Sequence, residues 1–262
     1  MSAIMLDGAM VHYEALGRGR PIVFLHGWVG SWRYWINAMQ VASTSFRAYA
    51  LDLYGFGDTF HDPLKYTLER QANLVHMFLE EMGMGRIAIV GHGLGALVGL
   101  AFMEQFPRSV DRIMAVNCPF GSDGISLRMR TASVTELVEW LSGRSPETIA
   151  VLSDSAKTDP LAIVASIDSL QADSLLGLVR ATGNPCLFVS GQNDPAISVP
   201  PQDPSTTLPT MVHHIMLDDV GHFPMIEDPL KFNRLMTDFM ALDSGISPKE
   251  LQLKEEWRRR VR

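Results

Sequence analysis

Short apolar runs alternate along this chain with segments in which apolar residues recur every three or four positions. Runs of the first kind predict strands over 10–16, 21–27, 46–53, 86–91, 112–117, 185–191 and 212–219. The second pattern predicts helices over 31–42, 67–82, 94–106 and 229–241. Because strands and helices take turns, we expect an α/β fold with a mostly parallel central sheet flanked by helices.

The burial of these elements follows from the same pattern. In the segment 67–82, apolar residues at three- and four-residue spacing form one face that would pack on the sheet: Leu68, Ala72, Val75, Leu79 and Met82. The predicted strands from residue 21 onward are apolar throughout, which is typical of strands covered by helices on both faces. The sheet is therefore expected to lie between two helical layers.

Residues 119–182 interrupt the alternation. Ser, Gly and Pro join several short helical stretches there, and no run is convincing as a strand. We expect an inserted helical cap over 119–182, between core segments 1–118 and 183–245, although a long crossover connection is the alternative. Farther on, the segment "VPPQDPSTTLPT" has four prolines within twelve residues, which disfavours a regular helix.

The last segment, 246–262, predicts a C-terminal helical extension. Ser247 can cap a helix with Pro248 at its first position and Glu250 three residues after the cap. Leu251, Trp257 and Val261 form an incomplete apolar stripe among basic residues. Two interpretations stay open: a solvated, frayed tail, or a docking element for a protein partner or an anionic surface.

Composition narrows the function classes. A chain of 262 residues that is 47% hydrophobic suits one large domain, with or without an insertion. The net charge of −7 shows no block of like sign before the C-terminus, which disfavours nucleic-acid binding. No signal peptide and no membrane-spanning run is visible, and Cys118 and Cys186 have no metal or redox spacing. We expect a soluble, cytoplasmic protein.

Two motifs in the first half of the chain follow predicted strands. "HGWVGS" (26–31) comes directly after an apolar run, and Gly27 would let the chain pass close to a ligand. "LDLYGFGDT" (51–59) contains Asp52, which we expect to satisfy backbone donors rather than to act as an acid.

The segment "IVGHGLGA" (89–96) has the strand, tight turn and helix of a nucleophile elbow, G-x-S-x-G. Its central position is Gly93, which has no side chain. A nucleotide loop is a poor alternative because the third glycine of G-x-G-x-x-G would fall on Ala96, and the P-loop lysine is missing.

An acid and a base follow in the second half. Asp194 comes just after an apolar strand in "VSGQNDPAI", and His222 lies in "VGHFPMIEDP" after the last predicted strand. Asp123 is a weaker alternative acid. Cys118 has no paired base in the sequence, so we interpret it as a buried apolar residue.

In this order, the four motifs resemble the α/β-hydrolase fold family, over residues 4–118 and 183–242. The resemblance implies that Gly93 stands at the nucleophile position and that Asp194 orients His222 as the base. It also implies that the backbone N–H groups of Trp28 and Leu94 form an oxyanion hole. The substrates it implies are esters or related acyl compounds, with no metal and no organic cofactor.

Glycine at the elbow keeps the turn, because it adopts a positive φ without the penalty of a Cβ atom, but it removes the acyl-enzyme route. Three interpretations remain. The chain is catalytically silent as a serine hydrolase and binds a ligand or partner; or the His222–Asp194 pair acts directly as a general base; or a hydrolase has had its serine replaced deliberately. We place the first ahead because it requires no chemistry that the residues do not show.

Overall fold

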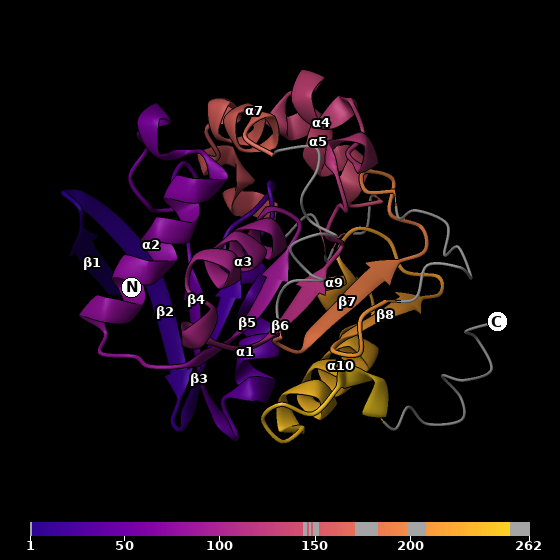
Figure 1. Cartoon of the computed structure of the whole chain (residues 1–262). Coiled ribbons are helices and arrows are strands. Elements are labelled where there is room, and N and C mark those ends of the chain that lie inside the picture. Colours follow the sequence, from indigo (N-terminus) through magenta and orange to yellow (C-terminus); the bar gives the residue numbers. More distant parts are fainter. Residues whose placement is uncertain are drawn as a thin grey trace.

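The computed structural model describes residues 2–143, 146, 148, 152–170, 183–198 and 208–251. Eight strands form one sheet in the order β1-β2-β4-β3-β5-β6-β7-β8 (Figure 1). The strands are β1 (Ser2–Leu6), β2 (Ala9–Gly17), β3 (Arg20–Leu25), β4 (Phe46–Leu51), β5 (Ile87–His92), β6 (Val110–Val116), β7 (Cys186–Gly191) and β8 (Val212–Leu217). The two pairings of β2 are antiparallel, and all other pairings are parallel. The predicted mostly parallel α/β sheet is confirmed.

Both faces of the central sheet are covered. Every residue of β5 and β7 is buried, as the uniformly apolar runs predicted. Helix α2 packs against α3, and α1 against α10. Their bounds are α1 (Ile36–Ala42), α2 (Leu68–Glu81), α3 (Leu94–Gln105) and α10 (Pro229–Ala241).

Two local predictions need correction. The N-terminal strand β1 was not predicted, because "SAIML" shows no clear alternation of apolar and polar residues. The helix expected over 31–42 begins instead as a 3-10 helix, η1 (Trp32–Trp35), whose N-cap Ser31 accepts a hydrogen bond from the Arg33 N–H.

Short helices fill the chain between β6 and β7. They are η4 (Ser122–Gly124), α4 (Arg128–Thr131), α5 (Val134–Leu141), η5 (Leu152–Lys157) and α7 (Pro160–Asp168), and α4, α5 and α7 lie together at the top of Figure 1. Helix α5 starts at a capping box formed by Ser133 and Glu136. Within the described residues of this region no strand occurs. Its limits as a cap, 119 and 182, stay a prediction.

The remaining short elements are η2 (Pro63–Lys65), η3 (Pro107–Ser109), α9 (Pro224–Glu227) and η6 (Pro248–Glu250). The predicted cap at Ser247 is confirmed, since its Oγ accepts a hydrogen bond from the Lys249 N–H at 3.2 Å. Predictions for the proline-rich segment and for the tail after Leu251 fall on residues outside the described part. None of the helices that the structure describes is long and apolar enough to cross a membrane.

Candidate active site

The elbow motif forms a sharp turn between β5 and α3. Gly93 has φ +50°, in the left-handed region that glycine adopts without strain, as predicted. Its N–H donates to the Val116 carbonyl at 2.9 Å, and its carbonyl accepts from Leu97 N–H at 3.2 Å. The turn is therefore fixed by β6 on one side and by the first turn of α3 on the other.

The side chain of Trp28 lies against Gly93. A Cβ atom built on Gly93 would be 3.2 Å from two atoms of the Trp28 indole and 3.7 Å from the Cα of Gly27. The indole is fully buried, and its Nε1–H donates to Ser166 Oγ on α7 at 3.0 Å. The Trp28 side chain, from the "HGWVGS" loop, thus connects the elbow to the helices between β6 and β7.

The two predicted oxyanion donors lie on adjoining loops. Leu94 opens α3, so its backbone N–H has no acceptor inside the helix. Trp28 directly follows Gly27, whose Cα faces the elbow. Their role as an oxyanion hole stays a prediction.

Asp194 and His222 meet in a buried pair. His222 Nδ1 lies 2.9 Å from both carboxylate oxygens of Asp194, and the two side chains are 1% and 2% exposed. Asp194 Oδ1 also accepts from the N–H groups of Ala196 at 2.8 Å and Ile197 at 3.2 Å. The Asp194 carboxylate can only accept a hydrogen bond, so His222 Nδ1 must carry the proton. When the His222 imidazole is neutral, its Nε2 therefore has a free lone pair.

Asn117, which was not predicted as a site residue, holds the loops on both sides of this pair. It follows β6 with φ +42°, and its Nδ2 donates to the carbonyls of Gly221 at 3.1 Å and His222 at 2.9 Å. Its Oδ1 accepts from the N–H of Gly191 at 2.8 Å, at the end of β7. One amide therefore links the end of β7 to the loop that carries His222.

Glu227 supports the same loop from α9. Its two carboxylate oxygens accept hydrogen bonds from the Gly221 N–H at 2.6 Å and the Phe223 N–H at 2.7 Å. Glu227 therefore binds the backbone on both sides of His222. The pattern "HFPMIE" did not reveal this contact, because an acidic residue in a short helix is more often solvated.

Glu227→Gln is expected to loosen the His222 loop. An amide NH₂ group then faces one of the two N–H groups, and a charge-assisted hydrogen bond is lost, which costs about 1–2 kcal/mol. Amide hydrogen exchange at Gly221 and Phe223 should become about tenfold faster. Unchanged exchange at both amides would contradict the assigned role.

A second buried chain of hydrogen bonds connects the two sides of the site. Gly27 N–H donates to Tyr34 Oη, and Tyr34 O–H reaches His92 Nδ1 at 3.0 Å. His92 Nε2 lies 2.8 Å from the His222 carbonyl, which can only accept, so Nε2 carries the proton and Nδ1 is the acceptor. Burial, and secondarily the nearby His222, lowers the pKa of His92 well below its usual value, so its imidazole is neutral.

Three other candidates have structural environments. His26 is fully buried and accepts the Leu53 N–H at Nε2, and burial lowers its pKa. Burial raises the pKa of the Cys118 thiol, which fits the predicted buried apolar residue. Asp123 is exposed in η4, and no described contact joins it to His222.

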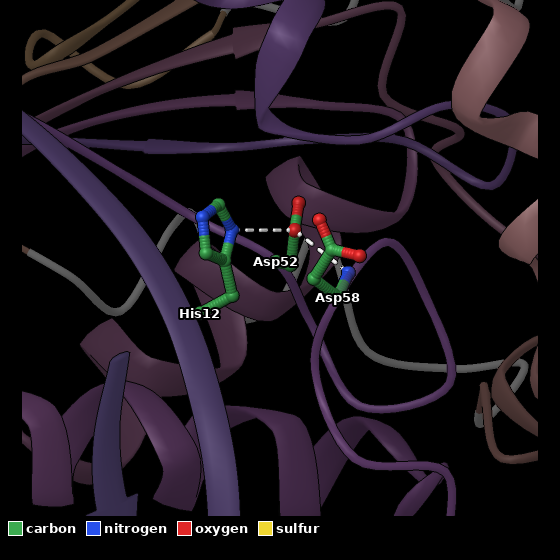
Figure 2. A group of neighbouring side chains, drawn as sticks. All are labelled: His12, Asp52 and Asp58. Carbon is green, nitrogen blue, oxygen red and sulfur yellow. Dashed lines mark hydrogen bonds and ion pairs between the residues drawn. The ribbon is translucent and has the colours of Figure 1, made fainter. Parts of the chain in front are cut away.

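Asp52 accepts backbone hydrogen bonds, as predicted. Its carboxylate takes the N–H groups of Trp32 at 2.8 Å and Asp58 at 3.1 Å. Figure 2 shows His12 Nδ1 pointing at the same carboxylate, at 2.8 Å. The ligand atoms of His12, Asp52 and Asp58 lie within 4.8 Å of one another, which is a possible metal arrangement. Hydrogen bonds already use the Asp52 oxygens, and Lys157 pairs with Asp58 at 2.8 Å, so we assign this cluster a structural role.

The His12–Asp52 contact predicts a pH dependence. Burial alone would lower the pKa of His12, but the hydrogen bond and charge of Asp52, together with the charges of Asp58 and Glu14, outweigh burial and raise the pKa above 6.5. A raised folded-state pKa stabilises the protein fully below the unfolded-state pKa, and this contribution is lost as pH rises through the folded-state pKa.

The free-energy difference between the native chain and His12→Gln should therefore be larger at about pH 5.5 than at about pH 9. Urea unfolding of both proteins at the two pH values measures this. A difference that grows with pH would contradict the assignment. Comparing the two proteins cancels the contributions of the other histidines.

Comparisons with known proteins identify the family of this chain. Residues 22–235 match the model of the Alpha/beta hydrolase family. The chain is 23% identical to the 2-hydroxy-6-oxo-6-(2'-aminophenyl)hexa-2,4-dienoic acid hydrolase of Metapseudomonas resinovorans, over 92% of this chain and 90% of that protein. It is 29% identical to the soluble epoxide hydrolase of Corynebacterium sp. (strain C12), but over only 43% of this chain and 40% of that protein.

Among solved structures, a mutant of the N-acyl homoserine lactonase AidH superposes with a TM-score of 0.80. The superposition covers 91% of this chain and 96% of that one, at 19% identity, so it supports the fold. The family model covers most of the chain, and the sheet is the eight-stranded, mostly parallel sheet described above. The chain belongs to the alpha/beta hydrolase family.

Proposed function

We propose that this protein binds a small ester or lactone beside Gly93 without forming an acyl-enzyme. One observation carries the proposal: Gly93 has no side chain, although its neighbour His92 lies against His222 of the buried Asp194–His222 pair, with the two ring centres 4.7 Å apart. A serine hydrolase needs a hydroxyl at this position to attack the carbonyl. The donors that we assign among the described residues, at Trp28 and Leu94, are backbone N–H groups, which can hold a carbonyl oxygen but cannot attack it.

The comparisons support ligand binding at such a site. The AidH mutant carries a serine-to-glycine substitution and is complexed with N-hexanoyl homoserine lactone. A protein of this fold with glycine in place of a serine therefore holds a lactone. The relatives of this chain are hydrolases, so a compound with a hydrolysable bond is the ligand class that their names suggest.

A second candidate function is general-base catalysis by His222. The specific observation that favours it is the buried pair with Asp194, which leaves Nε2 as the basic nitrogen. In this mechanism Nε2 removes a proton from water, and the resulting hydroxide attacks the carbonyl carbon. Alternatively, Nε2 removes an acidic proton of the ligand itself. Asp194 stabilises the imidazolium formed in either case.

A binding and hydrolysis experiment separates the two. The native chain is titrated with N-hexanoyl homoserine lactone by calorimetry, and lactone opening is followed by mass spectrometry. Binding with no opening beyond the buffer rate is the expected result. Opening that His222→Ala abolishes would establish general-base catalysis instead. No binding and no opening would contradict the ligand class. Arg70→Gln, an exposed change on α2, is the matched control for handling and stability.

A further inference from the structure

A pocket lies at the amino ends of the parallel strands, opposite the strand ends that carry Gly93. It has a volume of about 280 Å³ and is lined near the amino ends of β3, β5 and β6. Ala88 lines it, and His92 lies four residues farther along β5, about 13 Å away at the usual rise of a strand. The pocket is therefore separate from the candidate active site.

Three arginines line this pocket: Arg20, Arg86 and Arg112. Arg20 is exposed and stacks on Phe46, with its guanidinium carbon 5.5 Å from the ring centre. No carboxylate within the described ranges pairs with it. Arg86 is 49% exposed and donates from Nε to the Val110 carbonyl at 3.0 Å. Arg86 also donates from Nη1 to Ser244 Oγ at 3.2 Å and lies 3.5 Å from Asp111 Oδ1, so a ligand would share its guanidinium group with these two residues, whereas the guanidinium group of Arg20 is available from solvent.

Arg112 is the buried member, at 1% exposure. Its Nε donates to Asp111 at 2.7 Å and its Nη1 to the Phe239 carbonyl at 2.7 Å. Its Nη2 is buried and has no hydrogen-bond partner among the residues that the structure describes. A buried guanidinium N–H without an acceptor is unfavourable, and Arg112 is one of the residues that line the pocket.

One carboxylate offsets part of this charge. Burial alone would raise the pKa of Asp111, but hydrogen bonds from Ser244 and Arg112 and the nearby arginine charges lower it, so Asp111 is ionised. Three guanidinium groups and one carboxylate leave two positive charges around the pocket. A phosphate monoester carries a charge of about −1.5 to −2 at neutral pH, which matches.

Apart from Ser244, the rest of the lining is apolar and consists of Pro21, Phe46, Ala88 and Met240. An inorganic ion would leave these surfaces without a partner, whereas a small organic group would cover them. We propose that this pocket binds a small phosphorylated organic molecule, with its phosphate on Arg20, Arg86 and Arg112 and its body against the apolar wall.

Phenyl phosphate is the probe, titrated into the native chain by calorimetry and by amide NMR. Phenyl phosphate should bind several-fold more tightly than inorganic phosphate, which has no apolar group to cover the apolar lining. It should also bind several-fold more tightly than benzoate, which carries a single negative charge. Arg20→Gln and Arg86→Gln should each weaken binding at least about fivefold. Arg70→Gln on α2 serves as the control and should leave binding unchanged.

Both tested arginines are at the surface, so the variants are expected to fold, and thermal unfolding without ligand verifies this. No binding of phenyl phosphate at about 10 mM would overturn the proposal. Binding that both variants leave unchanged would place the ligand elsewhere and also overturn it. If benzoate binds as tightly as phenyl phosphate, the pocket does not select a phosphate group. If inorganic phosphate binds as tightly, the pocket does not select an organic group. Either result would overturn that part of the proposal.

Discussion

Gly93→Ser is expected to raise ester hydrolysis about a thousandfold or more over the native chain. Loss of a serine nucleophile reduces the turnover of a serine hydrolase by up to about a millionfold. On the proposed assignment of Gly93 to the nucleophile position, a serine placed there next to the Asp194–His222 pair should therefore recover a large share of such turnover. His222 and Asp194 already form their hydrogen bonds, and Trp28 has to move only a few tenths of an ångström for the new Cβ. Hydrolysis of p-nitrophenyl butyrate, with a burst from acyl-enzyme formation, is the measurement.

Two variants act as controls. Gly93→Ala introduces the same Cβ without the hydroxyl, so it should stay inactive. Both substitutions place a side chain at φ +50°, and both should lower the free energy of unfolding by about 1–3 kcal/mol. Gly93→Ser combined with His222→Ala should lose the gained activity. A well-folded Gly93→Ser variant without any gain would show that more than a hydroxyl is missing.

Gly95→Ala is expected to lower the free energy of unfolding by about 3 kcal/mol or more. A Cβ at Gly95 would lie 2.2 Å from the Leu25 carbonyl oxygen and 2.7 Å from that of His26. Both atoms belong to the backbone at the end of β3, so a side-chain rotation cannot relieve the contact. Helix α3 would have to move away from the sheet, which would also displace the elbow.

Urea unfolding measures this effect, with Gly85→Ala as the matched control. Gly85 has no atom within 4 Å of a built Cβ and no positive φ, so its substitution should change stability by less than about 0.5 kcal/mol. If the two alanine variants are equally stable, the close approach of α3 to β3 is not a constraint.

Much of the fold could be predicted because the local pattern of apolar and polar residues specifies most of its strands and helices. The strands from β2 to β8 were predicted, since each contains a short run rich in apolar, β-branched or aromatic residues. Strand β1 was missed, although a signal was present. Asp7 and Gly8 both have positive φ in the turn between β1 and β2, and an Asp-Gly pair between two short strands is typical of a tight hairpin.

The site could be predicted only in part, because its supporting contacts are distant in sequence. Gly93, Asp194 and His222 were selected because each follows a predicted strand within a recognisable motif. Asn117 contacts a loop more than a hundred residues away, and no local pattern marks it. The position of the Trp28 ring against Gly93 depends on rotamer packing, which spacing does not encode.

The attachment of His222 has a consequence for how variable this protein can be. Its loop is held by Asn117 at the end of β6 and by Glu227 on α9, and Asp194 by its own turn after β7. None of these anchors belongs to α4, α5 or α7, although the turn that carries Asp194 also pairs with residues 124–126, through the Ser126 N–H to the Ala196 carbonyl at 2.8 Å and the Ser198 N–H to the Gly124 carbonyl at 2.9 Å. If residues up to 126 are kept, we expect that α4, α5 and α7 can be exchanged to accept other ligands while the Asp194–His222 pair keeps its alignment.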